Sequence, residues 1–217
     1  MKKLLKISAY SYIAVITISF FGVIISGIFL GYNTSLIPIP DYSDLSAPFL
    51  ILYQLIILSL SVVALSGFIR LGHIFNNKLL VIITYIGIIF AIIYALYLIF
   101  GSFIVNIPDI PEPSPPFQNI YDEFLNFQFI SYIIYAIVIG IQSIFFGIAL
   151  IKLHDKVRYS KVAGILNIIG GATMLIEIGN FVMIAAMILE IILLFESSSK
   201  LERKKNQQIK SHTKVKT

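Results

Sequence analysis

Glu190 is the one ionisable side chain in this sequence that lies inside an apolar segment, away from any loop. It stands in residues 160–195, which read as two apolar stretches rich in small residues. An acid inside a membrane segment is costly, and it usually faces a polar partner or forms part of an ion or proton pathway. A functional hypothesis for this chain therefore starts from Glu190.

Asn167 is the polar partner that we predict for Glu190. If residues 160–195 form an antiparallel hairpin that turns between Ile178 and Gly179, Asn167 and Glu190 lie at the same depth. A bare carboxylate there would avoid its desolvation cost by binding a proton. We therefore expect a neutral Glu190 hydrogen-bonded to the Asn167 amide, a bond worth about 0.6–2 kcal/mol.

Helical spacing supports this pairing. Asn167 shares a face with Gly164 and Gly171, and Glu190 shares a face with Gly179, Met183 and Ala186. Both polar groups should therefore point between helices rather than toward lipid. We favour a structural role for the pair over proton or ion binding.

Other reactive constellations are missing from the sequence. It has no cysteine, which excludes disulfides, thiolate metal sites and thiol catalysis. His73, His154 and His212 lie in basic segments rather than inside apolar ones, where a membrane haem would need its ligands. The chain holds no GxSxG, HExxH, P-loop or GxGxxG motif. We expect no catalytic residues, no metal site and no cofactor, and hence no enzyme.

The composition is that of a membrane protein. Hydrophobic residues make up 58% of the 217 residues and charged residues only 12%. Since a bilayer core of about 30 Å needs about 20 apolar residues per helix, several spans are expected. We predict an all-α, polytopic membrane protein with six transmembrane helices in three antiparallel hairpins. The approximate predicted spans are residues 7–31, 49–69, 79–105, 127–151, 160–178 and 181–195.

Charge decides the predicted topology. With six spans and a cytoplasmic N-terminus, every Lys and Arg falls on the cytoplasmic side, as the positive-inside tendency requires. The other side receives acidic loops, including the Pro-rich segment 106–126. We therefore predict a multi-pass protein of the cell membrane with both termini cytoplasmic. The net charge of +5 is explained by topology, so nucleic acid is not an expected partner.

The sequence divides into a six-helix transmembrane domain, residues 1–196, and a basic tail, residues 197–217. The tail is too polar to bury a core, and we expect it to be disordered. Its seven Lys and Arg residues would be attracted to anionic lipid headgroups.

Small residues recur at helical spacing in three of the predicted spans and indicate close helix packing. They are Ser19, Gly22 and Ser26; Ala136, Gly140, Ser143 and Gly147; and Ser160, Gly164, Asn167 and Gly171. Such seams could also bind other membrane subunits. The C-terminal segment GILNIIGGATMLIEIGNFVMIAAMILEIILLF, preceded by KVRYSK, resembles the C-terminal hairpin of uncharacterised multispan membrane proteins common in archaea. That resemblance implies a membrane location and no particular activity.

Two functions remain open from the sequence. The first is a non-enzymatic, helix-packing or accessory subunit of a membrane assembly, which the seams favour. The second is a small ion or solute transporter or channel that uses Glu190. Besides Glu190, the polar residues available for a path are Gln54, Gln142, Asn167 and Asn180. A water-accessible cavity reaching Glu190 would distinguish the second function.

Overall fold

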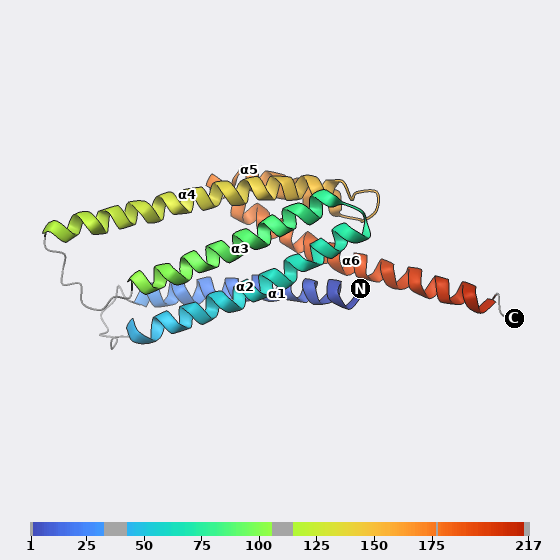
Figure 1. Ribbon diagram of the computed structural model, residues 1–217, viewed down its shortest axis with the longest axis horizontal. Coiled ribbons are helices and arrows are strands. Elements are labelled where there is room, and N and C mark those ends of the chain that lie inside the picture. The colour runs from blue at the N-terminus through green and yellow to red at the C-terminus, as the bar shows by residue number, and fades with distance from the viewer. Residues whose placement is uncertain (1, 33–42, 106–114, 177, 215–217) are drawn as a thin grey trace.

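The protein is a bundle of long helices (Figure 1), seen in a computed structural model that describes residues 2–32, 43–105, 115–176 and 178–214. All regular elements in these ranges are helical, which confirms the predicted all-α class. In chain order they are α1 (Lys2–Tyr32), α2 (Ser43–Ile74), α3 (Lys78–Val105), α4 (Pro115–Ile151), α5 (Ser160–Ala172), a short 3₁₀ turn η1 (Met174–Ile176) and α6 (Ile178–Lys214).

Five of these helices are long and apolar enough to cross a bilayer. The spans are Lys3–Phe21, Ile51–Ile74, Lys78–Tyr97, Ile133–Ile151 and Ile178–Glu202. The fifth helix of the predicted six, α5, has only 13 residues and rises about 20 Å. It packs against α4 and the longer α6.

The hairpin turn comes earlier than predicted. Helix α5 ends at Ala172 rather than near Ile178, because Gly170 and Gly171 are poor helix formers. The Thr173 hydroxyl then donates to the carbonyl of Ile169, at 2.7 Å, and so competes with the helical pattern. The chain passes through η1 before α6 begins.

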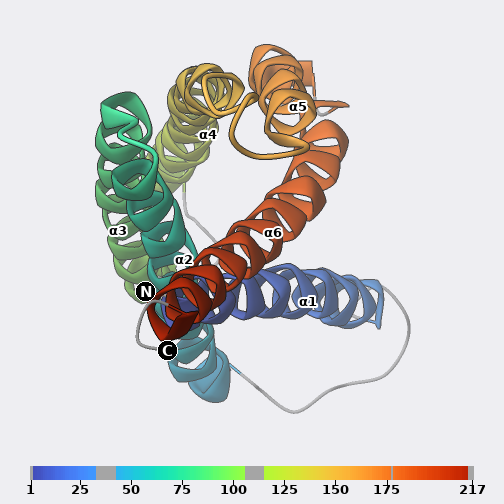
Figure 2. The same cartoon turned by 90° about the vertical axis from the view of Figure 1, so that its right-hand side faces the viewer.

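The first and last helices are neighbours. Helix α1 packs against both α2 and α6, while α4 packs mainly against α5 (Figure 2). The Ser8 hydroxyl donates to the carbonyl of Val63, at 2.9 Å, and so joins α1 to α2. Asn77 directly precedes α3, and its side-chain Oδ1 accepts a hydrogen bond from the Leu80 backbone N–H. The Asn77 Nδ2 group donates to the carbonyl of Ala149 on α4.

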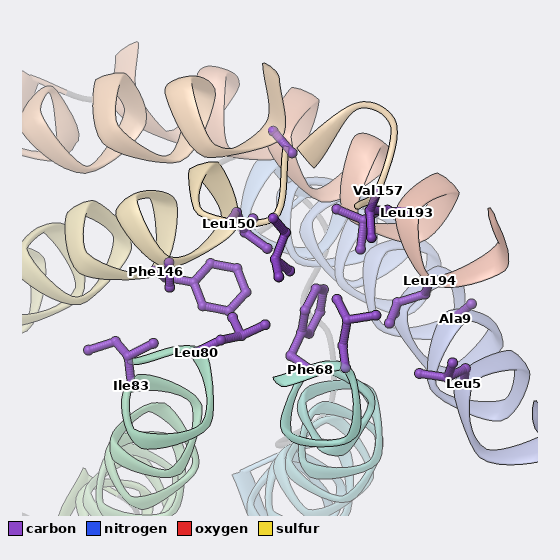
Figure 3. Packing of buried hydrophobic residues seen from close by; sticks show 14 residues of the cluster. Leu5, Ala9, Phe68, Leu80, Ile83, Phe146, Leu150, Val157, Leu193 and Leu194 are labelled. Atoms are coloured by element: carbon purple, nitrogen blue, oxygen red, sulfur yellow. The ribbon is translucent and has the colours of Figure 1, made fainter. Parts of the chain in front are cut away.

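The packed apolar core lies at the end of the bundle where α1 begins, here called the N-terminal end. Phe68 and Phe146 enter it from α2 and α4, with ring centroids 5.0 Å apart (Figure 3). Further side chains from α1, α3, α4, α6 and the α4–α5 loop complete it, among them Leu5, Leu80, Leu150, Val157, Leu193 and Leu194. Burial of these side chains holds this end of the bundle closed.

The basic segments meet at the same end. Lys156, in the α4–α5 loop, donates to the carbonyl of Phe75 in the α2–α3 loop, at 3.0 Å. Lys200 on α6 donates to the carbonyl of Lys156, at 3.2 Å. Helix α1 begins and α6 ends on this side of the bundle (Figure 1). The predicted gathering of basic segments is therefore present; its assignment to the cytoplasm stays a prediction.

Two predicted irregular segments are partly helical. The prediction of a disordered tail is wrong for residues 197–214, because α6 continues to Lys214. Because the membrane-spanning part of α6 is already helical, the helix can continue at little cost into a segment rich in Lys, Glu, Gln and Arg, which are good helix formers. An ion pair between Lys200 and Glu196, at 3.0 Å, lies at the start of this extension. The predicted loop 106–126 is likewise helical from Pro115, a residue suited to a helix start. Its first part, residues 106–114, lies outside the described residues.

Candidate functional site

Glu190 is fully enclosed where α1, α5 and α6 meet, with 1% of its surface exposed. Each carboxyl oxygen has one partner: the Asn167 Nδ2 donates to Oε1 at 2.6 Å, and the Tyr12 hydroxyl lies 2.6 Å from Oε2. These three side chains form the polar network of the site.

The predicted contact between Asn167 and Glu190 is present. The Asn167 amide also donates to the carbonyl of Ala163 one turn earlier, at 2.9 Å, which fixes its orientation. On α6, Gly179 and Ala186 are buried on the same face as Glu190, as the helical spacing predicted. The protonation state of Glu190 and its structural or ion-binding role stay predictions.

Tyr12 is the member of the network that sequence reasoning missed. The chain has 12 tyrosines, most of them readily explained as interfacial or packed rings, so residue type did not single it out. A weak signal was available in its helical face. Tyr12 lies one turn after Ser8, and Ser8 is itself buried against α2.

Close packing of α4 and α5 sets the position of Asn167. Gly147 and Gly164 face each other so closely that a Cβ at either position would strike the backbone carbonyl oxygen of the other. Gly140 and Gly171 repeat this relationship further along both helices. Because glycine has no side chain, the two backbones can approach closely at these positions, as they do in small-residue interfaces between membrane helices. The predicted seams of α4 and α5 therefore pack against each other inside the chain.

A cavity of about 320 Å³ lies beside the network, between α1, α2, α3, α4 and α6. Tyr12 forms part of its wall, so one side chain both lines the cavity and contacts Glu190. Most of the lining is aliphatic or aromatic. The polar side chains that line it are Tyr12, Gln54, Ser61, Tyr94, Tyr135 and Gln142. Pockets with an apolar wall and a few convergent polar groups are the usual form of a small-molecule site.

Gln142 is the most distinctive polar group of the cavity. Its amide nitrogen fills the space that a side chain at residue 87 would take, because Gly87 has none. Its Oε1 atom is buried and has no hydrogen-bond partner among the described residues. A buried acceptor without a donor is unfavourable, and rotation of the Gln142 amide toward the cavity would let a ligand or water satisfy this oxygen.

The cavity is closed toward the N-terminal end. On α1, Ala9 belongs to the packed core and Tyr12, one turn further along, lines the cavity. On α4, which runs the opposite way, Gln142 lines the cavity and Phe146 belongs to the core. The Tyr12 and Phe68 rings, with centroids 6.1 Å apart, mark the boundary between the two regions. The packed core therefore lies between the cavity and the N-terminal end.

The remaining sequence candidates lie elsewhere. Asn180 is exposed near the start of α6, away from the cavity. His73 and His154 are exposed at the N-terminal end, where the His154 ring contacts Asp155 at 2.8 Å. Within the described ranges, no group of three or more His, Asp or Glu side chains is arranged to hold a metal ion.

Fold and site together define a polytopic helical membrane protein with a polar network beside an intramembrane cavity. Comparison with protein-family models, curated proteins and solved structures finds no match to this chain. The resemblance of its C-terminal hairpin to multispan membrane proteins therefore stays a prediction.

Proposed function

We propose that this protein is a non-enzymatic membrane transporter or channel that binds a small ion or solute in the cavity between α1, α2, α3, α4 and α6. The supporting observation is the double role of Tyr12, which lines the cavity and contacts the carboxyl group of Glu190. Through Tyr12, Glu190 can respond to what occupies the cavity, and it is the one acid classed as buried in the part of the chain that the structure describes. Intramembrane acids beside such spaces are typical of coupled transport.

The accessory-subunit role is the second candidate, and the geometry supports it less well. This role was inferred from the small-residue seams. The seams of α4 and α5 pack against each other within the chain, so they are not exposed to a partner subunit. On α1, Ser19 is half-buried, and the side chains of Gly22 and Ser26 lie outside the described residues. Recovery of a stable partner after mild-detergent purification from the native membrane would favour this candidate.

The proposed setting is the cell membrane, with the N-terminal end of the bundle in the cytoplasm. The clustering of Lys and Arg at that end supports this orientation. The end of α6 would then lie close to anionic headgroups, each basic residue contributing about 1 kcal/mol near the surface.

Flux in proteoliposomes tests the proposal. The purified protein is reconstituted, and uptake of labelled inorganic cations, organic amines, amino acids and sugars is compared with uptake by empty vesicles. Glu190→Gln and Tyr12→Phe should each reduce the flux of the transported class. Ser59→Ala is the matched control, because Ser59 is exposed on α2 and bonds only within its own helix. The proposal fails if no compound in the panel moves in a manner that depends on Glu190.

A further inference from the structure

We infer that the cavity binds a small organic ammonium ion, and that this ion competes with a proton on Glu190. The inference rests on the cavity of the proposed function but not on transport itself, since a site can bind without conducting. It names the class of ligand, the group that senses it and the direction of the pH dependence.

The lining chemistry points to a cation with an apolar body. Within the described residues, no charged side chain lines the cavity, but the carboxyl group of Glu190 contacts its wall through Tyr12. An anion would therefore find no counter-charge, whereas a cation would lie near an acid. The Gln142 side chain lines the cavity, and rotation of its amide would bring the Oε1 atom, a buried acceptor without a donor, toward a positive charge there. The rings of Phe90, Tyr94 and Tyr135 also line the cavity, and aromatic faces attract organic ammonium groups.

A bare metal ion fits this lining less well. Hard cations require several oxygen ligands gathered around one point. The polar side chains here are spread over four helices, and aliphatic and aromatic groups form most of the wall. The stacked rings of Tyr94 and Tyr135, with centroids 3.9 Å apart, further restrict how their hydroxyl groups can converge.

The Tyr12–Glu190 contact couples the ligand to a proton. When Glu190 is ionised, both carboxyl oxygens accept, one from Asn167 and one from Tyr12, and the Tyr12 oxygen turns its lone pairs toward the cavity. When Oε2 carries a proton, it donates to the Tyr12 oxygen, and the Tyr12 hydrogen must turn elsewhere. The first state favours a cation in the cavity, and the second disfavours it.

No other charged group intervenes in this exchange among the described residues. The groups that face Glu190 are Tyr12 from α1 and Asn167 from α5. The titratable groups that α3 and α4 contribute to the cavity are the phenols Tyr94 and Tyr135, while α2 contributes the neutral Gln54 and Ser61. Cation binding should therefore strengthen as pH rises and Glu190 loses its proton.

Cysteine reactivity tests the inference directly, because the chain contains no cysteine of its own. Ser61→Cys places a thiol on the cavity wall, and Ala91→Cys provides a second reporter from α3. Each variant, purified as the full chain, is treated with the cationic reagent 2-(trimethylammonium)ethyl methanethiosulfonate and with the anionic 2-sulfonatoethyl methanethiosulfonate. The ratio of the two rates removes the contribution of thiol ionisation, since both reagents need the same thiolate.

We expect the cationic reagent to react faster, and the rate ratio to rise by about tenfold between about pH 6 and about pH 9. Adding Glu190→Gln should leave the ratio independent of pH. Tetramethylammonium chloride should protect the cavity thiol, while equal concentrations of sodium or potassium chloride should not. Ser59→Cys is the matched control on the same helix, two residues away and exposed, and should show neither the pH-dependent ratio nor protection.

Other results would overturn the inference or the transport proposal. Absence of reaction at both reporters would mean that the cavity is not accessible to a hydrated cation. If the rate ratio does not change with pH in the protein that retains Glu190, the ligand does not compete with a proton on Glu190. If only sodium or potassium protects the thiol, the ligand is an inorganic ion. Protection without flux would leave the ammonium site standing while the transport proposal fails, and flux without protection would do the reverse.

Discussion

The Tyr12 hydroxyl lies 2.6 Å from Oε2 of Glu190, and so joins the first helix to the last across 178 residues of sequence. With Asn167 on the opposite oxygen, each carboxyl oxygen of Glu190 has one hydrogen-bond partner. This arrangement makes separate predictions about stability and about ligand binding.

Glu190→Gln should change stability by less than about 1 kcal/mol, whereas Glu190→Leu should cost about 2 kcal/mol or more. A glutamine can accept from Asn167 and donate to the Tyr12 oxygen, but leucine leaves both groups buried without a partner. Denaturant unfolding in mixed micelles, followed by tyrosine fluorescence, measures both changes. Equal damage by Gln and Leu would show that charge, rather than hydrogen bonding, matters at this position.

Tyr12→Phe should destabilise the bundle by about 1–3 kcal/mol, because it leaves one buried oxygen of Glu190 without its donor. In a double-mutant cycle with Glu190→Leu, the two losses should not add, since both remove the same contact. The control is Tyr10→Phe, because Tyr10 lies two residues before Tyr12 on α1 and its side chain is exposed. Additive losses would mean that Tyr12 and Glu190 act independently.

Gly147→Ala should destabilise the α4–α5 contact by about 1–3 kcal/mol, since the new methyl group meets the backbone oxygen of Gly164. Backbone cannot give way as a side chain can, so the two helices must separate. The movement would carry Asn167 with α5. Thermal stability in detergent checks the loss, and an unchanged value would contradict the observed closeness of the two backbones.

Gly87→Ala should cost less than about 1 kcal/mol, because the new methyl group meets only the movable amide of Gln142. The displaced amide would enter the cavity that it lines. Labelling of Ser61→Cys should therefore slow in this background while stability stays close to that of the parent. If Gly87→Ala leaves the labelling rate of Ser61→Cys unchanged, the Gln142 amide does not lie in the path of the reagent.

Single cysteines also test the orientation. Ser199 is exposed on α6 at the N-terminal end, whereas its neighbour Ser198 is buried and unsuitable as a reporter. On intact cells an impermeant thiol reagent should label Ser114→Cys, in the predicted external loop, and leave Ser199→Cys unlabelled until the cells are opened. The reverse pattern would invert the proposed topology.

The sequence by itself determined the features that depend on local order along the chain. Runs of apolar residues predicted the long helices, and the confinement of Lys and Arg to particular segments predicted one basic end. Helical periodicity and hairpin connectivity were enough to bring Asn167 opposite Glu190, because the two helices follow one another directly. The earlier end of α5 did not change this pairing, because Asn167 Nδ2 still lies 2.6 Å from Glu190 Oε1.

Only the tertiary structure decided which distant helices became neighbours. Tyr12 reaches Glu190 because α1 packs against α6, and no short-range pattern in the sequence encodes that choice. The cavity likewise needs side chains from five helices, with Gln142 and Gln54 brought together from α4 and α2. Such contacts arise from the packing of whole helix surfaces, of which the close approach of α4 and α5 at Gly147 and Gly164 is an example.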